Sequence, residues 1–457
     1  LRNTINQFIG STVALAAGFS VGREGPAVHL GAACSSYIGN KLNLPYNAIR
    51  SLSACGIAAG IAACFNTPVA AVLFVMEVIL REYKVHIFIP VMIAAIVGSM
   101  TTSSIFGVNH DFGYFTAITL NSQHYPALVL LGIVLGIFAF IFNRYLILVI
   151  KSSARFHIVP RILTAALITG ALGYAVPYAM GTDIGAINFS LQNNLELQLL
   201  LGLLVAKMIM TIMALGLGIP GGIIGPILGI GAIAGTCGSV IATYFISGDI
   251  SASDFALMGM AGFMAATLNA PLAALLCVVE MSNQIEIIVP AMIVITTACI
   301  ASGQFFGNRS IFIMQLEAQG LPYRRPPIEK ALQRIGVIGV MDENITLLQQ
   351  ADDSAITKAL SNQTLSYNIV NKMTMPNAAT EFTLYQQSTI NIETEAKLAK
   401  HILVPLCSQS TLAEAYLLLV KERAGGVYIY LDDPNEIIGI ITFDYIRSYL
   451  LKGKTNK

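Results

Sequence analysis

The stretch GREGPAVHLGA at residues 22–32 returns two hundred residues later as GIIGPILGIGA at residues 222–232. Both copies have Gly at the first position, Gly-Pro at the fourth and fifth, and Gly-Ala at the last two. A longer motif repeats in the same order, because GIAAGIAACFNTPVAAVLFVME at residues 56–77 aligns with GMAGFMAATLNAPLAALLCVVE at residues 259–280. An apolar composition produces matched Ala and Gly by chance, but not a matched Asn-x-Pro and a matched Glu. The sequence therefore predicts a duplicated fold.

The composition indicates that most of the chain does not face water. Of its 457 residues 55% are hydrophobic and 11% are charged, and the mean hydropathy is +0.70. Soluble domains have about a quarter charged residues. Residues 1–318 hold fewer than half of the charges, so we expect a membrane part, then a linker near EAQGLPYRRPP at residues 317–327 and a soluble tail. The net charge of +1 gives nucleic-acid binding no electrostatic support.

The seven cysteines show no metal-ligand spacing and are expected to be small buried side chains. An intramembrane enzyme would need a catalytic set such as His-Glu-x-x-His or paired membrane aspartates, which the sequence does not contain. No enzyme activity and no bound metal are therefore expected.

Apolar runs suited to membrane helices recur along residues 1–318. They lie at residues 3–20, 50–79, 87–107, 126–152, 161–180, 195–217, 223–246, 254–280 and 287–306. About 20 apolar residues cross the hydrocarbon of a bilayer. Several runs reach that length, whereas others are broken at GREGP, FNTP, GIPGGIIGP and LNAP. Broken helices persist at membrane depth only inside protein or beside a cavity, and together with internal repeats they are typical of transporters. We predict an all-α polytopic membrane protein.

The broken helices also predict an anion pathway. Each repeat places Gly and Pro where a helix begins, and Pro is favoured in the first turn. Helix N-termini carry partial positive charge and unpaired N–H groups, and glycine lets an ion approach the backbone. Two N-termini, one from each repeat, are expected to converge on one anion, whereas a cation carrier would need acidic residues or unwound carbonyls. The second copy has more than 90 residues before Gly222 and the first only 21 before Gly22, so roughly 70 further residues of helix are expected upstream.

Four motifs carry a resemblance to a known family: GREGP followed by Val-His, FNTPVAAVLFVME, GIPGGIIGP and LNAPLAALLCVVEM. With these motifs, nearly all of residues 1–318 resembles the CLC family of chloride channels and chloride/proton antiporters. The resemblance implies tilted, broken helices in two inverted halves, at about residues 1–107 and 124–306, with a final helix at about 308–318. It also implies a homodimer with one chloride pathway per subunit, in the lipid bilayer of the plasma or inner membrane, with a cytoplasmic C-terminal tail.

Glu24 lies within GREGP, inside an otherwise apolar part of the chain. An ion pair with Arg23 explains it poorly, because adjacent side chains of a helix do not face one another. An intramembrane carboxylate at a positive helix end mimics an anion, and its protonation removes the competition with that anion. The resemblance implies that Glu24 is the gate, and in antiporters also a proton carrier. Arg23 is either a structural charge or an anion contact.

Further anion contacts follow from the resemblance. The backbone amides of Ile223 and Ile224 match the family's central contacts, with Gly25 and Gly222 beside them. Phe312 falls where the family usually has a tyrosine whose hydroxyl donates to the anion, so a weaker and less discriminating site is expected. The family's Gly-Ser-Gly-x-Pro loop would lie upstream, and the role is not transferred to GLGIP at residues 216–220.

Val78 bears on the mode of transport. In the family's antiporters its position holds an internal glutamate that passes protons, so valine favours passive, channel-like conduction. The alternatives are a chloride/proton antiporter with an atypical proton route through Glu77, and a fluoride-selective relative. Glu77 and its repeat counterpart Glu280 also indicate a shared structural role at helix ends. Lys207, a lone cation in an apolar run and the counterpart of Gln7, either raises the potential along the pathway or extends to a membrane interface.

Residues 401–446 predict a strand, a capped helix, a strand, a turn and a strand. Ser410 or Thr411 is placed to cap the helix together with Glu414, and DDPNE forms the turn. This segment resembles the second half of a CBS domain, a soluble α/β fold, so residues 401–457 are assigned to it. Residues 319–400 are assigned to a linker and a degenerate first half.

The end of the tail holds a candidate nucleotide site. Thr442, Asp444 and Tyr445 lie where CBS domains bind adenine nucleotide, although the usual Asp three residues after the threonine is replaced by Tyr445. The tail is therefore interpreted either as a nucleotide sensor or as a packing element of a dimer. No other cofactor is expected.

Overall fold

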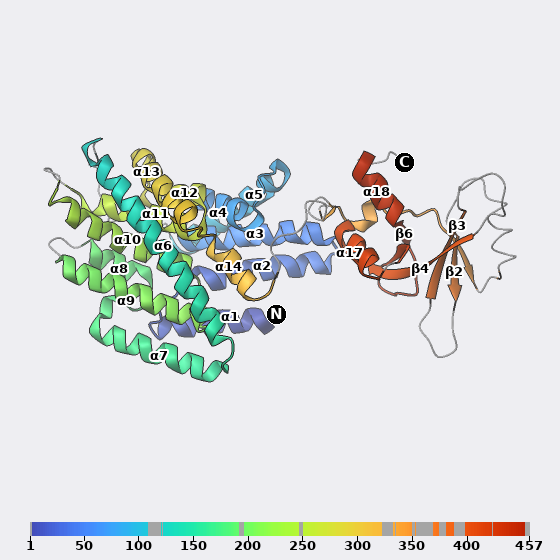
Figure 1. Cartoon of the computed structure of the whole chain (residues 1–457), viewed down its shortest axis with the longest axis horizontal. Helices are drawn as coiled ribbons and strands as arrows, with labels where there is room; N and C mark the ends of the chain where they lie inside the picture. Colours follow the sequence, from blue (N-terminus) through green and yellow to red (C-terminus); the bar gives the residue numbers. More distant parts are fainter. Residues whose placement is uncertain are drawn as a thin grey trace. The chain divides into compact units, whose positions relative to one another are not determined.

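The computed structural model describes residues 2–107, 120, 122–191, 196–245, 250–321, 332–333, 335–349, 352, 369–373, 381–387, 398–422 and 424–452. The chain forms two compact units. One comprises Leu1–Tyr37 and Ser51–Tyr323, and the other comprises Ile38–Arg50 and Arg324–Lys457. The first unit is helical, and the second contains the β-strands (Figure 1).

The helices before residue 107 are α1 Arg2–Ala16, α2 Glu24–Lys41, α3 Tyr46–Phe65, α4 Pro68–Phe74 with its π-helical continuation η1 Val75–Leu80, and α5 Val85–Phe106. The second repeat begins with η2 Ser122–His124, α6 Tyr125–Ser153, α7 Ile158–Ala175, η3 Pro177–Ala179, α8 Asp183–Ser190 and α9 Leu197–Gly216. It continues with α10 Ile224–Ala242, α11 Ala252–Leu268, α12 Pro271–Ser282, η4 Ile285–Ile287, α13 Ile288–Cys299, η5 Ile300–Phe305 and α14 Ile311–Ala318.

Several helices of the helical unit have the length and apolar composition of membrane-spanning helices. Within the described residues, seven helices are long and apolar enough to cross a bilayer. The apolar runs 50–79 and 254–280 are each divided into two helices, because Asn66 and Asn269 adopt left-handed backbone conformations, with φ of 53° and 54°. Asn tolerates this conformation, and a proline then starts the next helix, at Pro68 and Pro271. The repeated Asn-x-Pro is thus a repeated helix break.

The two copies of the first motif pair directly with one another. Gly22 and Gly222 form an antiparallel bridge in which each N–H donates to the other's carbonyl oxygen at 2.8 Å. The same symmetry appears upstream, where Gly18 and Gly218 end their helices with φ of 82° and 92°. Residues two hundred positions apart therefore occupy equivalent backbone positions, as the sequence repeat predicts.

The two copies of the second motif run in opposite directions. The Glu77 carboxylate accepts hydrogen bonds from the N–H groups of Leu272 and Ala273, at 3.3 and 2.8 Å, where α12 begins. The Glu280 carboxylate, near the end of α12, accepts from Val69 and Ala70 at the start of α4, at 3.0 and 2.7 Å. Each helix thus ends beside the other's beginning. These reciprocal bonds confirm the shared structural role predicted for Glu77 and Glu280.

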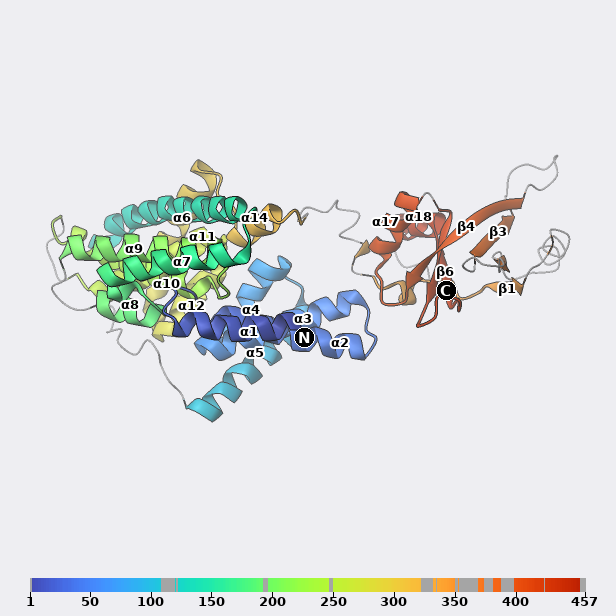
Figure 2. The same cartoon turned by 90° about the horizontal axis from the view of Figure 1, so that it is seen from below.

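The core of the helical unit lies around α10 and α11. The span of α10 is 83% buried, far more than any other membrane-length helix, and other helices surround it (Figure 2). Close crossings are possible because glycine faces glycine. A Cβ on Gly231 of α10 would lie 2.6 Å from the carbonyl oxygen of Gly259 on α11, and a Cβ on Gly31 of α2 would collide with the carbonyl of Gly56 on α3. The same crossing is therefore made once in each repeat.

Replacing Gly231 by Ala is expected to destabilise the helical unit by about 1–3 kcal/mol, because overpacking forces the backbones of α10 and α11 apart. The measurement is the apparent Tm in detergent, followed by size-exclusion chromatography after heating. The control is Gly202→Ala in α9, where an added Cβ meets nothing within 4 Å and alanine favours the helix. Equal Tm values for the two variants would contradict the close crossing.

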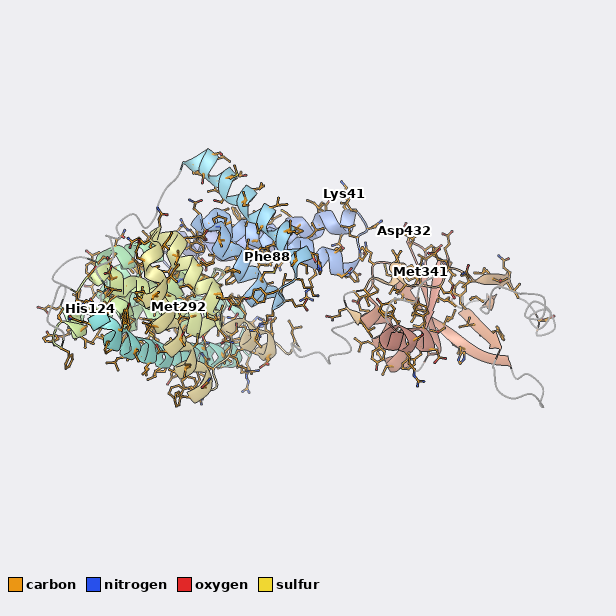
Figure 3. All side chains as sticks on the ribbon, turned by 90° about the horizontal axis from the view of Figure 1, so that it is seen from above. Lys41, Phe88, His124, Met292, Met341 and Asp432 are labelled. Carbon is orange, nitrogen blue, oxygen red and sulfur yellow. The ribbon has the colours of Figure 1, made fainter. Side chains whose placement is uncertain are left out.

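The outward faces of the helices are apolar. Ile93, Leu163 and Met292 are each at least half exposed, and Figure 3 marks Met292 among the side chains of the helical unit. Such faces suit a lipid environment. Cys237 and Cys277 are buried as expected, but Cys34 is exposed. The prediction that all cysteines are buried is therefore wrong, because apolar positions here face outward as well as inward.

The second unit contains a sheet in the strand order β1-β2-β3-β4-β5-β6 among its described residues. The strands are β1 Thr346–Gln349, β2 Ile369–Met373, β3 Glu381–Gln387, β4 Leu398–Cys407, β5 Gly426–Tyr430 and β6 Gly439–Thr442, with the turn η6 Val337–Gly339 and the helices α17 Leu412–Glu422 and α18 Phe443–Lys452. β1 with β2 and β4 with β5 are parallel, and the other pairs are antiparallel.

The C-terminal part of this unit follows the predicted order of elements, with β4, α17, β5, a turn and β6 in sequence. The cap of α17 is formed by Thr411, whose N–H donates to the Glu414 carboxylate at 2.7 Å. This is one half of a capping box. Of residues 319–400, assigned to a linker and a degenerate first half, much lies outside the described residues, and the described part contains β1, β2, β3 and the start of β4.

Candidate functional site

The Glu24 carboxylate lies at the N-terminus of a helix from the other repeat. Glu24 is the first residue of α2 and is only 2% exposed. Its Oε1 accepts hydrogen bonds from the backbone N–H of Ile224 at 2.6 Å and of Gly225 at 3.1 Å, where α10 begins. Hydrogen bonds from N–H groups to a carboxylate are strong, and the partial positive charge of the helix end adds to them. The side chain occupies the kind of position in which helix N-termini bind anions.

Glycines make this approach possible. A Cβ added to Gly22 or to Gly222 would collide with the Glu24 carboxylate. A Cβ added to Gly25 would lie 2.5 Å from the backbone nitrogen of Gly222. The predicted convergence of two helix N-termini is therefore observed, and the glycines of the repeated motif supply the space for it.

Two cavities lie against Glu24, and Glu24 lines both of them. The larger has a volume of about 360 Å³ and is lined by residues 218–224 together with residues from α1, α2, α4, η1, α9 and α14. The smaller is only about 20 Å³ and is lined by Arg23, Phe65, Thr182 and Ile184 among others. Such a volume suits about one water molecule. The carboxylate therefore stands between a roomy cavity and a narrow one.

The structure brings most of the predicted anion contacts to the larger cavity. Gly25, Gly222, Ile223, Ile224 and Phe312 all line it, whereas Arg23 lines the smaller cavity. The Phe312 ring packs edge-to-face against Phe74, with ring centroids 6.2 Å apart. Phenylalanine offers no hydroxyl donor at this position.

Two side chains of the larger cavity were missed as candidate site residues by sequence reasoning. Gln7 on α1 and Gln315 on α14 both line it, and each carries an amide N–H₂ that donates hydrogen bonds. The sequence does hold a signal for Gln315, since it lies three residues after Phe312 and so on the same face of α14. In the sequence, Gln7 stands out only as the repeat counterpart of Lys207.

Lys207 is fully buried. Its Nζ donates to the carbonyl oxygens of Ala179 and Gly181, at 3.3 and 3.0 Å, in the turn that precedes α8. An interfacial position would leave the ammonium group exposed, so that alternative is wrong. The turn held by Lys207 leads directly to Thr182, which lines the smaller cavity.

Val78 is buried, at 7% exposure, in the π-helical segment η1. It is absent from the lining of both cavities at Glu24, although its neighbour Ile79 lines the larger one. Glu77 is already engaged by the amides at the start of α12. Neither residue contacts Glu24 through a described hydrogen bond.

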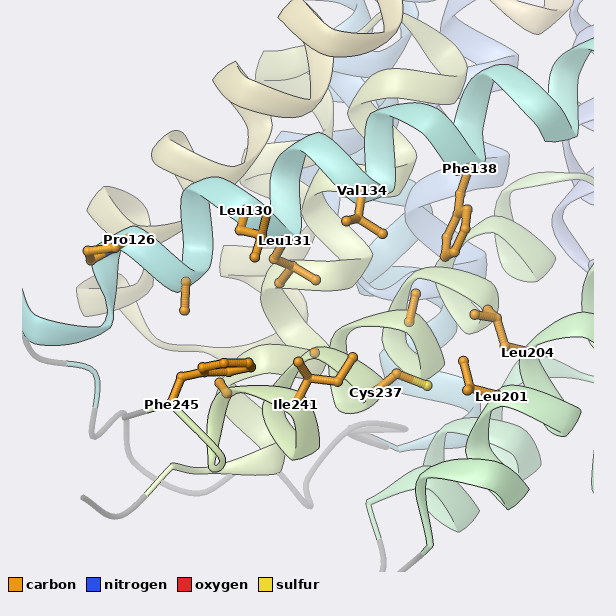
Figure 4. Close-up of a pocket in the computed structure, with 14 residues that line it drawn as sticks. Pro126, Leu130, Leu131, Val134, Phe138, Leu201, Leu204, Cys237, Ile241 and Phe245 are labelled. Atoms are coloured by element: carbon orange, nitrogen blue, oxygen red, sulfur yellow. The ribbon is translucent and has the colours of Figure 1, made fainter. Parts of the chain in front are cut away.

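A further cavity of about 350 Å³ lies between α6, α9 and α10 (Figure 4). Leu131, Phe138, Leu204 and Ile241 are typical of its lining, and Cys237 contributes a thiol. Among the described residues, no charged side chain and no amide side chain lines it. Its chemistry offers nothing to an anion, so the site is assigned to the Glu24 cavities.

The three predicted nucleotide-binding residues of the tail lie where β6 passes into α18. The Thr442 Oγ1 accepts a hydrogen bond from the Tyr445 N–H at 3.3 Å, which caps the helix, and Asp444 is exposed. The threonine hydroxyl therefore has a structural role in this position.

A membrane-spanning helical unit with paired helix breaks, and a buried carboxylate on the amides of a facing helix end, define a membrane transport protein. Known proteins identify the family. The model of the family described as "Voltage gated chloride channel" matches residues 1–303. The H(+)/Cl(-) exchange transporter ClcA of Vibrio cholerae serotype O1 (strain O395) is 31% identical over 343 residues, which cover 70% of this chain and 72% of that protein.

Two solved structures share the fold. A slow cyanobacterial Cl⁻/H⁺ antiporter aligns over 68% of this chain and 75% of its own, with a TM-score of 0.62 and 22% identity. A CLC-type fluoride/proton antiporter aligns over 65% and 73%, with a TM-score of 0.56 and 25% identity. This chain belongs to the voltage gated chloride channel family, the CLC family. It is a multi-pass membrane protein of a transport family and not an enzyme, and membership supports anion transport as its activity.

Proposed function

We propose that this protein moves chloride across a membrane along a pathway that the Glu24 side chain opens and closes. The observation that carries the proposal is the Glu24 carboxylate bound to the amides of Ile224 and Gly225, between two cavities. A carboxylate and a chloride ion need the same donors, so they compete for them. While the carboxylate is bound, the pathway is blocked at this point.

Protonation is the proposed release. A neutral carboxyl group binds the two N–H groups and the positive helix end more weakly than a carboxylate does. Acid therefore shifts the competition towards chloride, and the rate of chloride transport rises as the pH falls. Ile223 and Ile224 offer backbone amides to the ion, and Phe312 limits the larger cavity without donating to it.

The mode of transport has two candidates. Val78 carries no proton, which favours channel-like conduction, but the comparisons give this interpretation no support. The relative at 31% identity is named an H(+)/Cl(-) exchange transporter, which favours chloride/proton exchange with Glu24 as the proton carrier. In that case the proton reaches Glu24 by a route that does not pass through Val78.

A fluoride-selective activity is the second candidate for the substrate. It is favoured by the similarity to a CLC-type fluoride/proton antiporter at 25% identity. Side-by-side efflux of fluoride and chloride from the same liposomes distinguishes the two substrates, because a fluoride-selective protein releases little chloride.

The full-length protein in chloride-loaded liposomes tests the proposal. Chloride efflux and external pH are recorded together at neutral and acid pH. We expect chloride efflux that rises several-fold from pH 7 to pH 5. Proton uptake in a fixed ratio to chloride would establish exchange, and efflux without proton uptake would establish conduction. Absence of chloride and fluoride efflux at every pH would contradict the transport proposal and the role of Glu24.

The proposal also covers the oligomeric state, the membrane location and the C-terminal tail. We propose a homodimer in the plasma or inner membrane with a cytoplasmic tail, as the family resemblance implies. The order β4, α17, β5, β6, α18 supports a CBS-like second half. Adenine nucleotide binding at Thr442, Asp444 and Tyr445 stays a prediction, and no other cofactor is proposed.

A further inference from the structure

A basic hollow lies at the C-terminal end of α6, away from Glu24. It has a volume of about 660 Å³ and is lined by Arg144, Ile147, Leu148, Lys151, Ser152, Arg155 and Phe156. Three of these seven side chains are cationic and none is acidic. All three cations are exposed, and none of them forms an ion pair with another described residue. The hollow thus presents three positive charges to its surroundings.

The cations lie beside exposed apolar side chains at the C-terminal end of α6. Arg144 and Lys151 are seven residues apart in the helix, a spacing that keeps side chains on one stripe, and Arg155 follows in the turn after α6 ends at Ser153. Leu148, three residues before Lys151, is 54% exposed, and Phe156, next to Arg155 in the turn, is 65% exposed. Basic groups and exposed apolar groups therefore line the same hollow.

An aromatic contact orients the Arg144 side chain. Its guanidinium lies over the Phe140 ring, 5.8 Å from the centroid. Phe140 in turn stacks on Phe306, with centroids 4.9 Å apart and an interplanar angle of 20°. A cation over an aromatic face is stabilised by the ring electrons, and its remaining N–H donors stay available to a phosphate.

The length of α6 allows these groups to reach the headgroup layer of a bilayer. The helix has 29 residues and runs along one side of the helical unit (Figure 2). At about 1.5 Å per residue, Arg144 lies about 28 Å from Tyr125 and Lys151 about 39 Å. The hydrocarbon is about 30 Å thick and its headgroup layers add several ångströms on each side. With Tyr125 at one interface and α6 close to the bilayer normal, Arg144 reaches the opposite edge of the hydrocarbon and Lys151 lies among the headgroups.

We propose that this hollow binds an anionic phospholipid, with its phosphates on Arg144, Lys151 and Arg155 and its acyl chains over Leu148 and Phe156. Charge complementarity selects the occupant, since three cations that have no ion-pair partner among the described residues attract phosphate at headgroup depth. Arg144 and Lys151 are about 10 Å apart along the helix, and Arg155 lies beyond them in the following turn, which favours a lipid with two phosphates, such as cardiolipin, over one with a single phosphate. The cations also suit the negative end of the helix dipole, but that role explains neither the hollow nor the exposed Phe156.

Native mass spectrometry of the full-length protein in detergent tests the proposal, with cardiolipin, phosphatidylglycerol and phosphatidylcholine as probes. Each basic residue near an anionic headgroup contributes about fivefold in affinity. The triple variant Arg144→Gln, Lys151→Gln, Arg155→Gln is therefore expected to bind cardiolipin roughly a hundredfold more weakly. The control is Lys41→Gln, Arg50→Gln, Arg447→Gln, which removes the same charge from exposed positions outside the hollow and is expected to bind like the wild type.

A further variant tests the apolar contacts of the lipid, and a competitor tests whether the ligand is a lipid or free phosphate. Phe156→Asn changes an exposed side chain and leaves all three cations in place. We expect it to weaken cardiolipin binding about fivefold. If the triple variant does not fold, Phe156→Asn still tests the proposal. The proposal would be overturned if the control and the triple variant lost cardiolipin binding equally. It would also be overturned if cardiolipin, phosphatidylglycerol and phosphatidylcholine bound with the same affinity. Displacement of the lipid by millimolar inorganic phosphate would also overturn it, because the hollow would then bind phosphate without recognising a lipid.

Discussion

Glu24→Gln is expected to give chloride transport that is fast at neutral pH and nearly independent of pH between 4 and 8. Glutamine keeps the shape of the side chain but loses the charge that the amides of Ile224 and Gly225 bind. Hydrogen bonds to a charged group contribute about 1–1.5 kcal/mol more than neutral ones, so the two bonds together weaken by about 2–3 kcal/mol. That loss corresponds to a roughly hundredfold weaker competition with chloride.

Proton movement is expected to disappear in the same variant, because an amide does not carry a proton in this pH range. Chloride efflux from liposomes and external pH give both quantities in one recording. The matched control is Glu286→Gln, since Glu286 is exposed and lies outside both cavities at Glu24. A Glu24→Gln protein that still transports faster in acid would show that another group controls the pathway.

Glu280→Ala and Glu77→Ala are each expected to lower the stability of the helical unit by about 2–4 kcal/mol. Each carboxylate binds two backbone N–H groups at the start of a helix in the other repeat. Removal leaves those donors without their acceptor and removes a negative charge from a positive helix end. An apparent Tm in detergent lower by about 5 °C or more is expected for each variant.

The double variant gives the sharper result. Both carboxylates join the same two segments, α4 with η1 and α12, so the second loss is expected to cost less than the first, with a coupling of about 0.5–3 kcal/mol. Glu286→Ala is the control and is expected to leave the Tm within about 1 °C. Fully additive effects would mean that the two contacts stabilise the fold independently, and unchanged Tm values would remove the proposed link between the repeats.

Much of the helical unit could be predicted because the internal symmetry of the fold appears as a repeat in the sequence. The matched glycines placed Gly22 opposite Gly222, and the matched Asn-x-Pro placed a helix break at the same point of each repeat. A backbone feature that needs glycine, or a left-handed asparagine before proline, leaves a local signature. These features need no knowledge of distant contacts.

What was not predictable depends on side chains that meet across the fold. The sequence indicated that Glu77 and Glu280 serve helix ends, but not that each serves the other repeat. Gln315 lines the larger cavity because α14 packs there, and the burial of Lys207 depends on the turn at residues 179–181. Periodicity shows which face of a helix is apolar, but not which distant group that face will meet.

We propose that the Glu24 carboxylate and the transported anion use the same amides. Anomalous diffraction from bromide-soaked crystals of the wild type at neutral pH and of Glu24→Gln tests it most directly. We expect a bromide peak within hydrogen-bond distance of the Ile224 and Gly225 nitrogens in Glu24→Gln, and no peak there in the wild type. A bromide ion beside an undisplaced Glu24 carboxylate, or amides that stay empty in Glu24→Gln, would contradict it.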